Sequence, residues 1–161
     1  MKIAYLGLGS NIGDREAHLV EAVKRLDSAD LRVLRCSSIY ETEPQDMRGQ
    51  AWFLNQVIEV ETGLLPIQLL ARIQKIEGEM HRQRETPKGP RTIDIDILLY
   101  DNVVIATTEL DIPHPRLAQR RFVLEPLAEL SPGLRHPVLD KTICELLPAT
   151  QAQIVRPWTI S

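Results

Sequence analysis

Two aspartates near the middle of the chain form the pattern with the clearest chemical potential. Asp94 and Asp96 alternate with isoleucines in the sequence Ile-Asp-Ile-Asp-Ile, residues 93–97. In an extended strand both carboxylates project from one face and the isoleucines from the other. Carboxylates about 7 Å apart at the backbone can hold one Mg²⁺ or flank a pair of ions. A solvated strand face is the alternative, but unpartnered aspartates on a well-buried strand are costly, which favours the metal site.

Basic residues on both sides of this pair indicate what the metal would hold. The cations are Arg82, Arg84, Lys88 and Arg91 before the aspartates, and Arg116, Arg120 and Arg121 after them. Phosphoryl transfer uses this combination, because Mg²⁺ bridges phosphate oxygens while guanidinium groups stabilise charge on the transferred and leaving groups. For any one of these arginines taken alone, a surface salt bridge is a better explanation than a phosphate contact. Together with the aspartates, they favour metal-dependent phosphate chemistry.

Three other residues could bind a ligand. His114 lies between two prolines and could donate to a phosphate or act as an acid, although a structural histidine explains it equally well. Phe53 and Phe122 are the two phenylalanines of the chain, and each lies beside polar residues. Core packing is the usual role of phenylalanine. A planar ligand clamped between the two rings is the alternative.

A glycine-rich stretch, residues 7–13, leads from an expected strand into an expected helix, as phosphate-binding loops do. It lacks the Lys-Ser/Thr ending of a P-loop and the spacing of a dinucleotide-binding motif. The sequence therefore favours a structural tight turn, with anion binding as the weaker option.

Hydrophobic periodicity predicts the order strand, helix, strand, strand, helix, strand over residues 1–100. The strands are expected at 3–8, 31–40, 53–61 and 93–100, the helices at 19–26 and 66–80, and two short helices at 122–130 and 144–147. Residues 148–161 carry little pattern, and we expect them to be loosely ordered. This order predicts an α+β sandwich, with helices packed on a mainly antiparallel sheet and a helical C-terminal third.

Composition narrows the class of protein. A chain of 161 residues, 43% hydrophobic and 25% charged, suits a single globular domain over residues 1–161. The net charge of −3 argues against a nucleic-acid-binding domain. No apolar run approaches the ~20 residues of a membrane span, and no signal-peptide pattern is present, so we expect a cytoplasmic protein. Cys36 and Cys144 have no metal-ligand spacing and are expected to be small buried residues.

Four segments carry a resemblance to a known family. They are Gly9-Ser10-Asn11, Phe53-Leu54-Asn55, residues 89–97 (Gly-Pro-Arg-Thr-Ile-Asp-Ile-Asp-Ile) and Pro113-His114-Pro115-Arg116. In order and spacing they resemble the 6-hydroxymethyl-7,8-dihydropterin pyrophosphokinase family of folate biosynthesis, from about residue 3 to residue 148. The resemblance implies a ferredoxin-like fold. It also implies transfer of the terminal diphosphate of ATP, a co-substrate, to the hydroxymethyl group of a reduced pterin, giving AMP.

The resemblance implies roles for individual residues. Asp94 and Asp96 would hold two Mg²⁺ ions. Arg82 and Arg91 would act as catalytic contacts to the phosphates, with Arg82 on a loop that closes over them. The ATP-binding residues implied are Gln74, Glu77, Arg82, Arg84, Arg91, His114 and Arg120, and the pterin-binding residues are Thr42, Phe53, Asn55 and Phe122.

Two positions depart from well-known members of that family, and both concern loop closure. Lys88 stands where some relatives have a tryptophan that helps to seal the closed loop, and Pro115 where some have a tyrosine.

Two other interpretations remain open. One is a different metal-dependent phosphotransferase or phosphatase with the same aspartate pair. The other is a ferredoxin-like RNA-binding module whose basic loop and phenylalanines contact bases, against which the acidic strand argues. The expected partners are the small molecules ATP and reduced pterin, without nucleic acid or membrane, and the expected state is a monomer.

Overall fold

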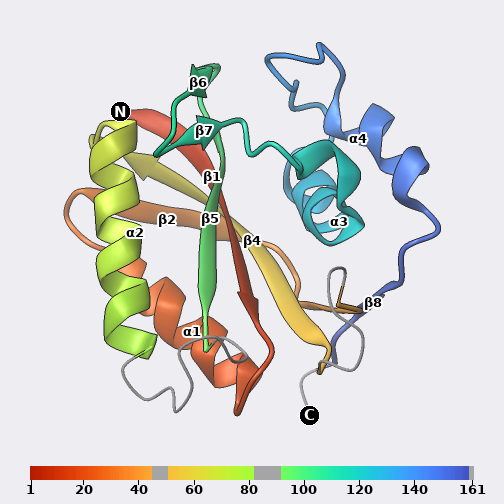
Figure 1. The fold of residues 1–161 in the computed structure, drawn as a ribbon, viewed down its shortest axis with the longest axis horizontal. Coiled ribbons are helices and arrows are strands. Elements are labelled where there is room, and N and C mark those ends of the chain that lie inside the picture. The colour runs from red at the N-terminus through yellow and green to blue at the C-terminus, as the bar shows by residue number, and fades with distance from the viewer. Residues whose placement is uncertain (45–50, 82–91, 160–161) are drawn as a thin grey trace.

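The computed structural model describes residues 1–44, 51–81 and 92–159 (Figure 1). The helices are α1 (Arg15–Leu26), α2 (Pro66–His81), α3 (Arg121–Leu130) and α4 (Ile143–Leu146), with the 3-10 helices η1 (Leu117–Gln119) and η2 (Leu147–Thr150). The strands are β1 (Lys2–Ser10), β2 (Leu31–Cys36), β3 (Tyr40–Thr42), β4 (Phe53–Thr62), β5 (Asp94–Tyr100), β6 (Ile105–Ala106), β7 (Asp111–Ile112) and β8 (Val155–Pro157).

A six-stranded antiparallel sheet organises the molecule. Its order is β5-β1-β4-β3-β8, and β2 pairs with the remaining half of β4. Strand β4 is long enough for both partners, since β2 pairs with residues 58–62 and β3 with residues 53–55. The predicted antiparallel sheet with packed helices is confirmed.

The single strand predicted over residues 31–40 is wrong, because two strands occupy this range. The break follows from Ser37, whose hydroxyl accepts the backbone N–H of Val57 at 2.9 Å. A side chain that replaces a strand carbonyl in this way interrupts the ladder between β2 and β3.

Apolar side chains pack on both faces of the sheet. On one face, α1 and α2 bury stripes at helical spacing: Leu19, Ala22 and Leu26 from α1, and Leu69, Ile73, Ile76 and Met80 from α2. On the other face lie α3 and α4, whose core residues are Val123, Leu124, Leu127, Ile143 and Leu146. Helix α3 covers only part of this second face (Figure 1).

Two expectations for the chain differ from the structure. Cys36 and Cys144 are exposed, not buried, because the end of β2 and the outer face of α4 both lie at the surface. Residues 148–159 are not loosely ordered, since they form η2 and then β8, which pairs with β3. A three-residue strand that pairs with a distant part of the chain leaves no local hydrophobic pattern to read.

Among the described residues, no helix has both the length and the apolar composition that crossing a bilayer requires.

Candidate active site

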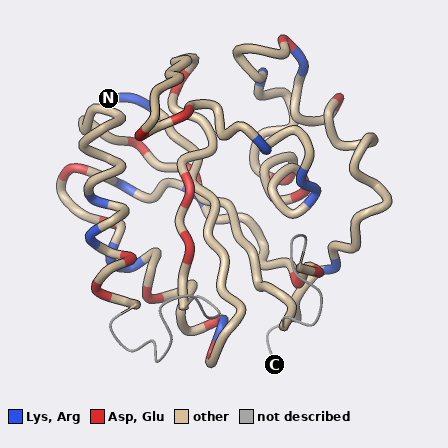
Figure 2. The backbone as a smooth tube through the Cα atoms, in the orientation of Figure 1, with Lys and Arg blue, Asp and Glu red and all other residues tan. Residues whose placement is uncertain are grey.

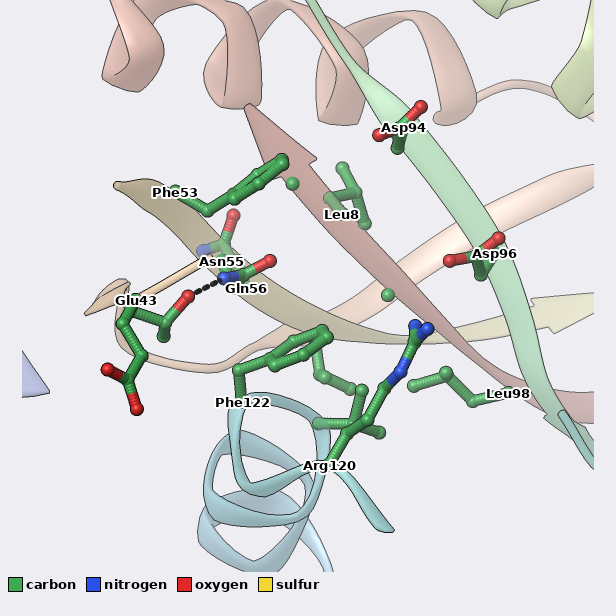
Figure 3. A pocket seen from close by; sticks show the side chains of 15 residues that line it. Leu8, Glu43, Phe53, Asn55, Gln56, Asp94, Asp96, Leu98, Arg120 and Phe122 are labelled. Atoms are coloured by element: carbon green, nitrogen blue, oxygen red, sulfur yellow. Dashed lines mark hydrogen bonds between the residues drawn. The ribbon is translucent and has the colours of Figure 1, made fainter. Parts of the chain in front are cut away.

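A pocket of about 250 Å³ opens on the face of the sheet opposite α1 and α2 (Figure 3). Its lining residues come from three strands of the sheet, the end of β3 and the start of α3. They are Gly7, Leu8, Gly9, Thr42, Glu43, Phe53, Asn55, Gln56, Val57, Asp94, Asp96, Leu98, Arg120, Phe122 and Val123. Segments up to about a hundred residues apart in sequence therefore meet at one cavity.

The floor of the pocket depends on two glycines of β1. Gly9 lies between Asn55 on β4 and Asp94 on β5, and Gly7 holds the equivalent position between Val57 and Asp96. A side chain at either position would project into the space above the sheet. Both glycines belong to β1, so the prediction that they form a tight turn is wrong for them.

The turn itself contains Gly13, which has a positive φ of 65°. This is a backbone conformation that favours glycine. Gly13 precedes Asp14, whose carboxylate accepts the backbone N–H of Ala17 at 3.1 Å and begins α1, as the sequence predicts for an N-cap.

Asp94 and Asp96 lie on the same face of β5, as the alternating pattern predicts, and both line the pocket. Asp96 is exposed and Asp94 is half-buried. Figure 2 shows acidic positions along β5 and basic positions near the start of α3. The cavity therefore carries carboxylates on one side and the guanidinium of Arg120 on the other.

These carboxylates suit Mg²⁺. Oxygen donors are what this ion prefers, and it usually retains water and substrate phosphate oxygens as its other ligands, so two carboxylates beside an open pocket are sufficient. Within the described ranges, no third Asp, Glu, His or Cys joins them to make a larger cluster.

His114 lies close enough to Asp96 to respond to its charge. Burial lowers the pKa of the His114 imidazole, the negative charge of Asp96 acts in the opposite direction, and Arg120 and Arg116 lower the pKa further. The ring accepts the backbone N–H of Arg116 at Nδ1, at 3.2 Å, which requires that nitrogen to be unprotonated. In this tautomer Nε2 carries the proton and can donate a hydrogen bond.

Glu77 of α2 makes a hydrogen bond to the backbone of β5. Its Oε2 accepts the backbone N–H of Ile95 at 2.9 Å, and Ile95 separates the two aspartates. Since β5 is an edge strand, this N–H needs a partner outside the sheet. Gln74, one turn earlier on α2, is exposed, and neither residue lines the pocket.

The four residues implied for the pterin all line this cavity. Thr42 and Asn55 are buried, with 2% and 7% of their surfaces exposed, and the Asn55 amide donates to the Thr42 hydroxyl at 2.5 Å. Phe53 reaches the pocket from β4 and Phe122 from α3, and Figure 3 shows Asn55 between the two rings. The guanidinium carbon of Arg120 lies 5.3 Å from the centre of the Phe122 ring.

The structure does not test four of the expected residues. Arg82, Arg84 and Arg91, together with Lys88, lie outside the described residues. Conversely, the sequence analysis missed Gly7, Gly9, Glu43, Gln56 and Leu98, all of which line the pocket. A signal existed for the glycines: their alternate spacing continues the strand pattern of residues 3–8, which places them on one face.

Comparison with known proteins is consistent with this arrangement. Residues 5–132 match the 7,8-dihydro-6-hydroxymethylpterin-pyrophosphokinase (HPPK) family. The 2-amino-4-hydroxy-6-hydroxymethyldihydropteridine pyrophosphokinase of Bacillus subtilis is 52% identical over 129 residues, covering 80% of this chain and 77% of that protein. The protein of the same name from Aquifex aeolicus is 43% identical over 148 residues, covering 92% of each chain.

Among solved structures, wild-type HPPK-DHPS of Plasmodium falciparum with pteroate matches with a TM-score of 0.74 at 20% identity. The match covers 92% of this chain and 42% of that chain, so this chain spans less than half the length of the solved protein. That likeness concerns the fold, whereas the family match and the bacterial relatives extend to the sequence. On these grounds the chain belongs to the 7,8-dihydro-6-hydroxymethylpterin-pyrophosphokinase family.

Proposed function

We propose that this protein transfers diphosphate from ATP to the hydroxymethyl group of 6-hydroxymethyl-7,8-dihydropterin, giving AMP and the pterin diphosphate, in folate biosynthesis. One observation carries the proposal: a single pocket contains an aromatic pair, a buried polar pair and a carboxylate pair. A pterin is a flat ring with a hydrogen-bonding edge, and the phosphates that it must meet require cations. Membership of the HPPK family supports the same reaction.

The pterin lies between Phe53 and Phe122, with its polar edge at Thr42 and Asn55. Flat rings gain from stacking on aromatic faces, and both phenylalanines line the cavity. Because the Thr42 hydroxyl oxygen accepts from Asn55, its hydrogen can donate to an acceptor on the ring. Such buried polar groups reject ligands that lack the matching atoms.

Asp94 and Asp96 hold two Mg²⁺ ions, which when bound neutralise phosphate charge. Arg120 adds a guanidinium on the opposite wall, and neutral His114 donates from Nε2 to a phosphate oxygen. Arg82, Arg84 and Arg91 supply further phosphate contacts, with Arg82 and Arg91 acting on the transferred group. Gln74 and Glu77 contribute to the nucleotide side of the site.

Positioning accounts for most of the rate. The pterin hydroxyl must attack the β-phosphorus of ATP in line, and the pocket aligns the two substrates on one face of the sheet. No residue forms a covalent bond to the transferred group in this reaction, so the chain needs binding groups and cations but no nucleophile.

The element order suggests a finer classification of the fold. The elements follow the strand-helix-strand-strand-helix-strand order of a ferredoxin-like sandwich. In chain order they are β1, α1, the pair β2 and β3, then β4, α2 and β5, with β2 and β3 sharing one strand position. Helices α3 and α4 of the C-terminal third then pack on part of the second face. We infer one domain over residues 1–161, acting as a cytoplasmic monomer on small molecules.

Release of AMP from Mg²⁺–ATP, with and without the pterin, tests the function. AMP that forms only when the pterin is present is the expected result. Orthophosphate or pyrophosphate in place of AMP would contradict the proposal and favour the phosphatase or nucleotidyl transferase alternative. Tight, salt-sensitive RNA binding in place of AMP formation would favour the RNA-binding module.

A further inference from the structure

The segment of residues 153–158 contacts two walls of the pocket. One wall is the end of β3, which carries Thr42 and Glu43. The other is the start of α3, which carries Arg120 and Phe122. A short piece of chain that touches both walls can set the distance between them.

The first wall is fixed by strand pairing. Val155 pairs with Thr42 in the antiparallel ladder between β8 and β3. The backbone N–H of Ile154 donates to the Glu43 carboxylate at 3.1 Å, and the Glu43 N–H donates to the Ile154 carbonyl at 3.4 Å. Two residues that line the pocket are therefore held directly by this segment.

On the other face of β3, charged and aromatic side chains reinforce its pairing with β8. Arg156 donates from Nε and Nη2 to one oxygen of the Glu41 carboxylate, at 3.0 and 2.7 Å, and Arg15 approaches the other oxygen at 3.1 Å. The guanidinium of Arg156 also lies 4.5 Å from the centre of the Trp52 ring. Successive strand residues face opposite sides, so this cluster holds β3 without entering the pocket.

The second wall is held in part by the side chain of Gln153. Its Oε1 accepts the backbone N–H of Arg121 at 2.9 Å, and its Nε2 donates to the carbonyl of Gln119 at 2.7 Å. Its own carbonyl accepts from the Arg121 guanidinium at 2.9 Å. The first N–H groups of a helix need partners outside the helix, and within the described structure the Arg120 side chain does not cap α3. Gln153 therefore caps α3 from 32 residues away.

The far end of α3 is already attached to the same sheet. Glu129 accepts the backbone N–H of Ser38 at 2.8 Å and the hydroxyl of Tyr40 at 2.6 Å. Val123, Leu124 and Leu127 pack α3 against the sheet, and the hydrogen bonds of Gln153 add a polar attachment at the beginning of the helix. Phe122 is the second residue of the helix, so its backbone lies next to this attachment.

We infer that Gln153 is a positioning residue for the pterin pocket, holding Phe122 and Arg120 at the correct distance from Thr42. The identity of the ligand rests on the proposed function. Gln153 does not line the cavity and acts through the start of α3.

The test compares Gln153→Ala with two matched variants. Gln151→Ala removes an exposed side chain two residues earlier, and Gln153→Glu keeps an oxygen acceptor for the Arg121 N–H. Loss of a helix cap costs about 1 kcal/mol of stability, and a bound state that must restore the capped geometry loses up to that amount of binding free energy, about fivefold in affinity. We expect Gln153→Ala to raise the KM and Kd for the pterin about fivefold, with a smaller change in the KM for ATP and a kcat near that of wild type. Gln151→Ala should match wild type, and Gln153→Glu should recover most of the affinity.

Equal pterin constants in folded Gln153→Ala and Gln151→Ala would overturn the inference. So would parallel losses for both substrates that track a lower melting temperature, because they would indicate general destabilisation.

A measurement that does not depend on enzyme activity separates this inference from the proposed function. Hydrogen exchange at the Arg121 amide should accelerate in Gln153→Ala and stay unchanged in Gln151→Ala. If wild-type protein forms no pterin-dependent AMP, the proposed function fails while the exchange result still tests the attachment. Unchanged exchange would overturn the positioning role whatever the activity.

Discussion

Gly9 and Asn55 face each other across the β1–β4 ladder so closely that a β-carbon on Gly9 would lie 2.7 Å from the Asn55 side-chain oxygen. Real β-carbons do not approach an atom this closely. The same Asn55 amide donates to Thr42 at the base of the pocket. The hydrogen bond between Asn55 and Thr42 therefore requires that residue 9 has no side chain.

Gly9→Ala should therefore weaken pterin binding. The new methyl group must displace Asn55 and break its hydrogen bond to Thr42, and a broken buried hydrogen bond costs about 1–3 kcal/mol. We expect the Kd for the pterin, measured by titration, to rise roughly tenfold or more. Gly7→Ala is the matched control on the same strand, since the three atoms nearest to its β-carbon all belong to the flexible Leu98 side chain, at 3.4 Å or more. An equal or larger loss in that control would contradict the assignment to Asn55.

Neutralising either pocket aspartate should remove most of the activity. Asp94→Asn and Asp96→Asn preserve size but remove the charge that Mg²⁺ needs, and metal-assisted charge stabilisation is worth several kcal/mol, so AMP formation should fall at least about a hundredfold. Asp101→Asn is the control, because Asp101 lies just after β5 and pairs with Lys2 at the surface. Near-normal turnover of the pocket variants at millimolar Mg²⁺ would refute the metal assignment.

The parts of the site that sequence predicts well are those carried by local patterns. Asp94 and Asp96 alternate with buried isoleucines, so their common face follows from strand geometry alone. The stripes of α1 and α2 are equally local. Thr42, Phe53, Asn55 and Phe122 line one pocket, but the family resemblance is what groups all four of them in advance, and their role in pterin binding stays a prediction.

The parts that sequence does not predict are contacts between distant segments. β8 is three residues long, and its pairing with β3 depends on partners such as Glu41 for Arg156. Gln153 resembles any surface glutamine until α3 is placed beside it. Cys36 follows an apolar pattern but falls at the exposed end of β2, where burial depends on packing. Periodicity carries no information on such contacts.

Gly78→Ala should stabilise the protein. Gly78 is exposed on α2, and among the described atoms nothing lies within 4 Å of its added β-carbon. Alanine is favoured over glycine within a helix by roughly 0.5–1 kcal/mol, and we expect a gain of that size in the free energy of unfolding by urea. Gly133→Ala, equally open but outside a helix, isolates the helical contribution. A loss of stability in Gly78→Ala would contradict this reading of α2.

Acid should destabilise the protein in part through His136. This side chain is buried, with 7% of its surface exposed, and its Nδ1 accepts the N–H groups of Val138 and Leu139 at 3.2 and 3.1 Å. Burial lowers the pKa of His136 below its ordinary value. The unfolded chain therefore binds the proton first, so the stabilisation is complete above about pH 6.5 and is lost as the pH falls through the lower folded pKa.

His136→Asn checks this assignment, since asparagine can accept the same N–H groups but does not titrate. We expect the drop in melting temperature between about pH 7.5 and about pH 5.5 to be smaller in the variant than in wild type. Part of the drop should remain, because the pKa of His114 is also lowered by burial. An identical drop in both proteins would exclude His136 as a source.

The attachment of β8 to β3 also bears on the order in which the protein is completed during synthesis. Ile154 follows its partner Glu43 by 111 residues, and Gln153 follows Arg121 by 32. Local helices and the early strands can form while the chain is still emerging, whereas long-range pairing must wait for both partners. A nascent chain that has emerged only as far as α3 would already contain every described residue that lines the pocket, yet its walls would not be held together. Ligand binding should therefore be among the last properties that the growing chain acquires.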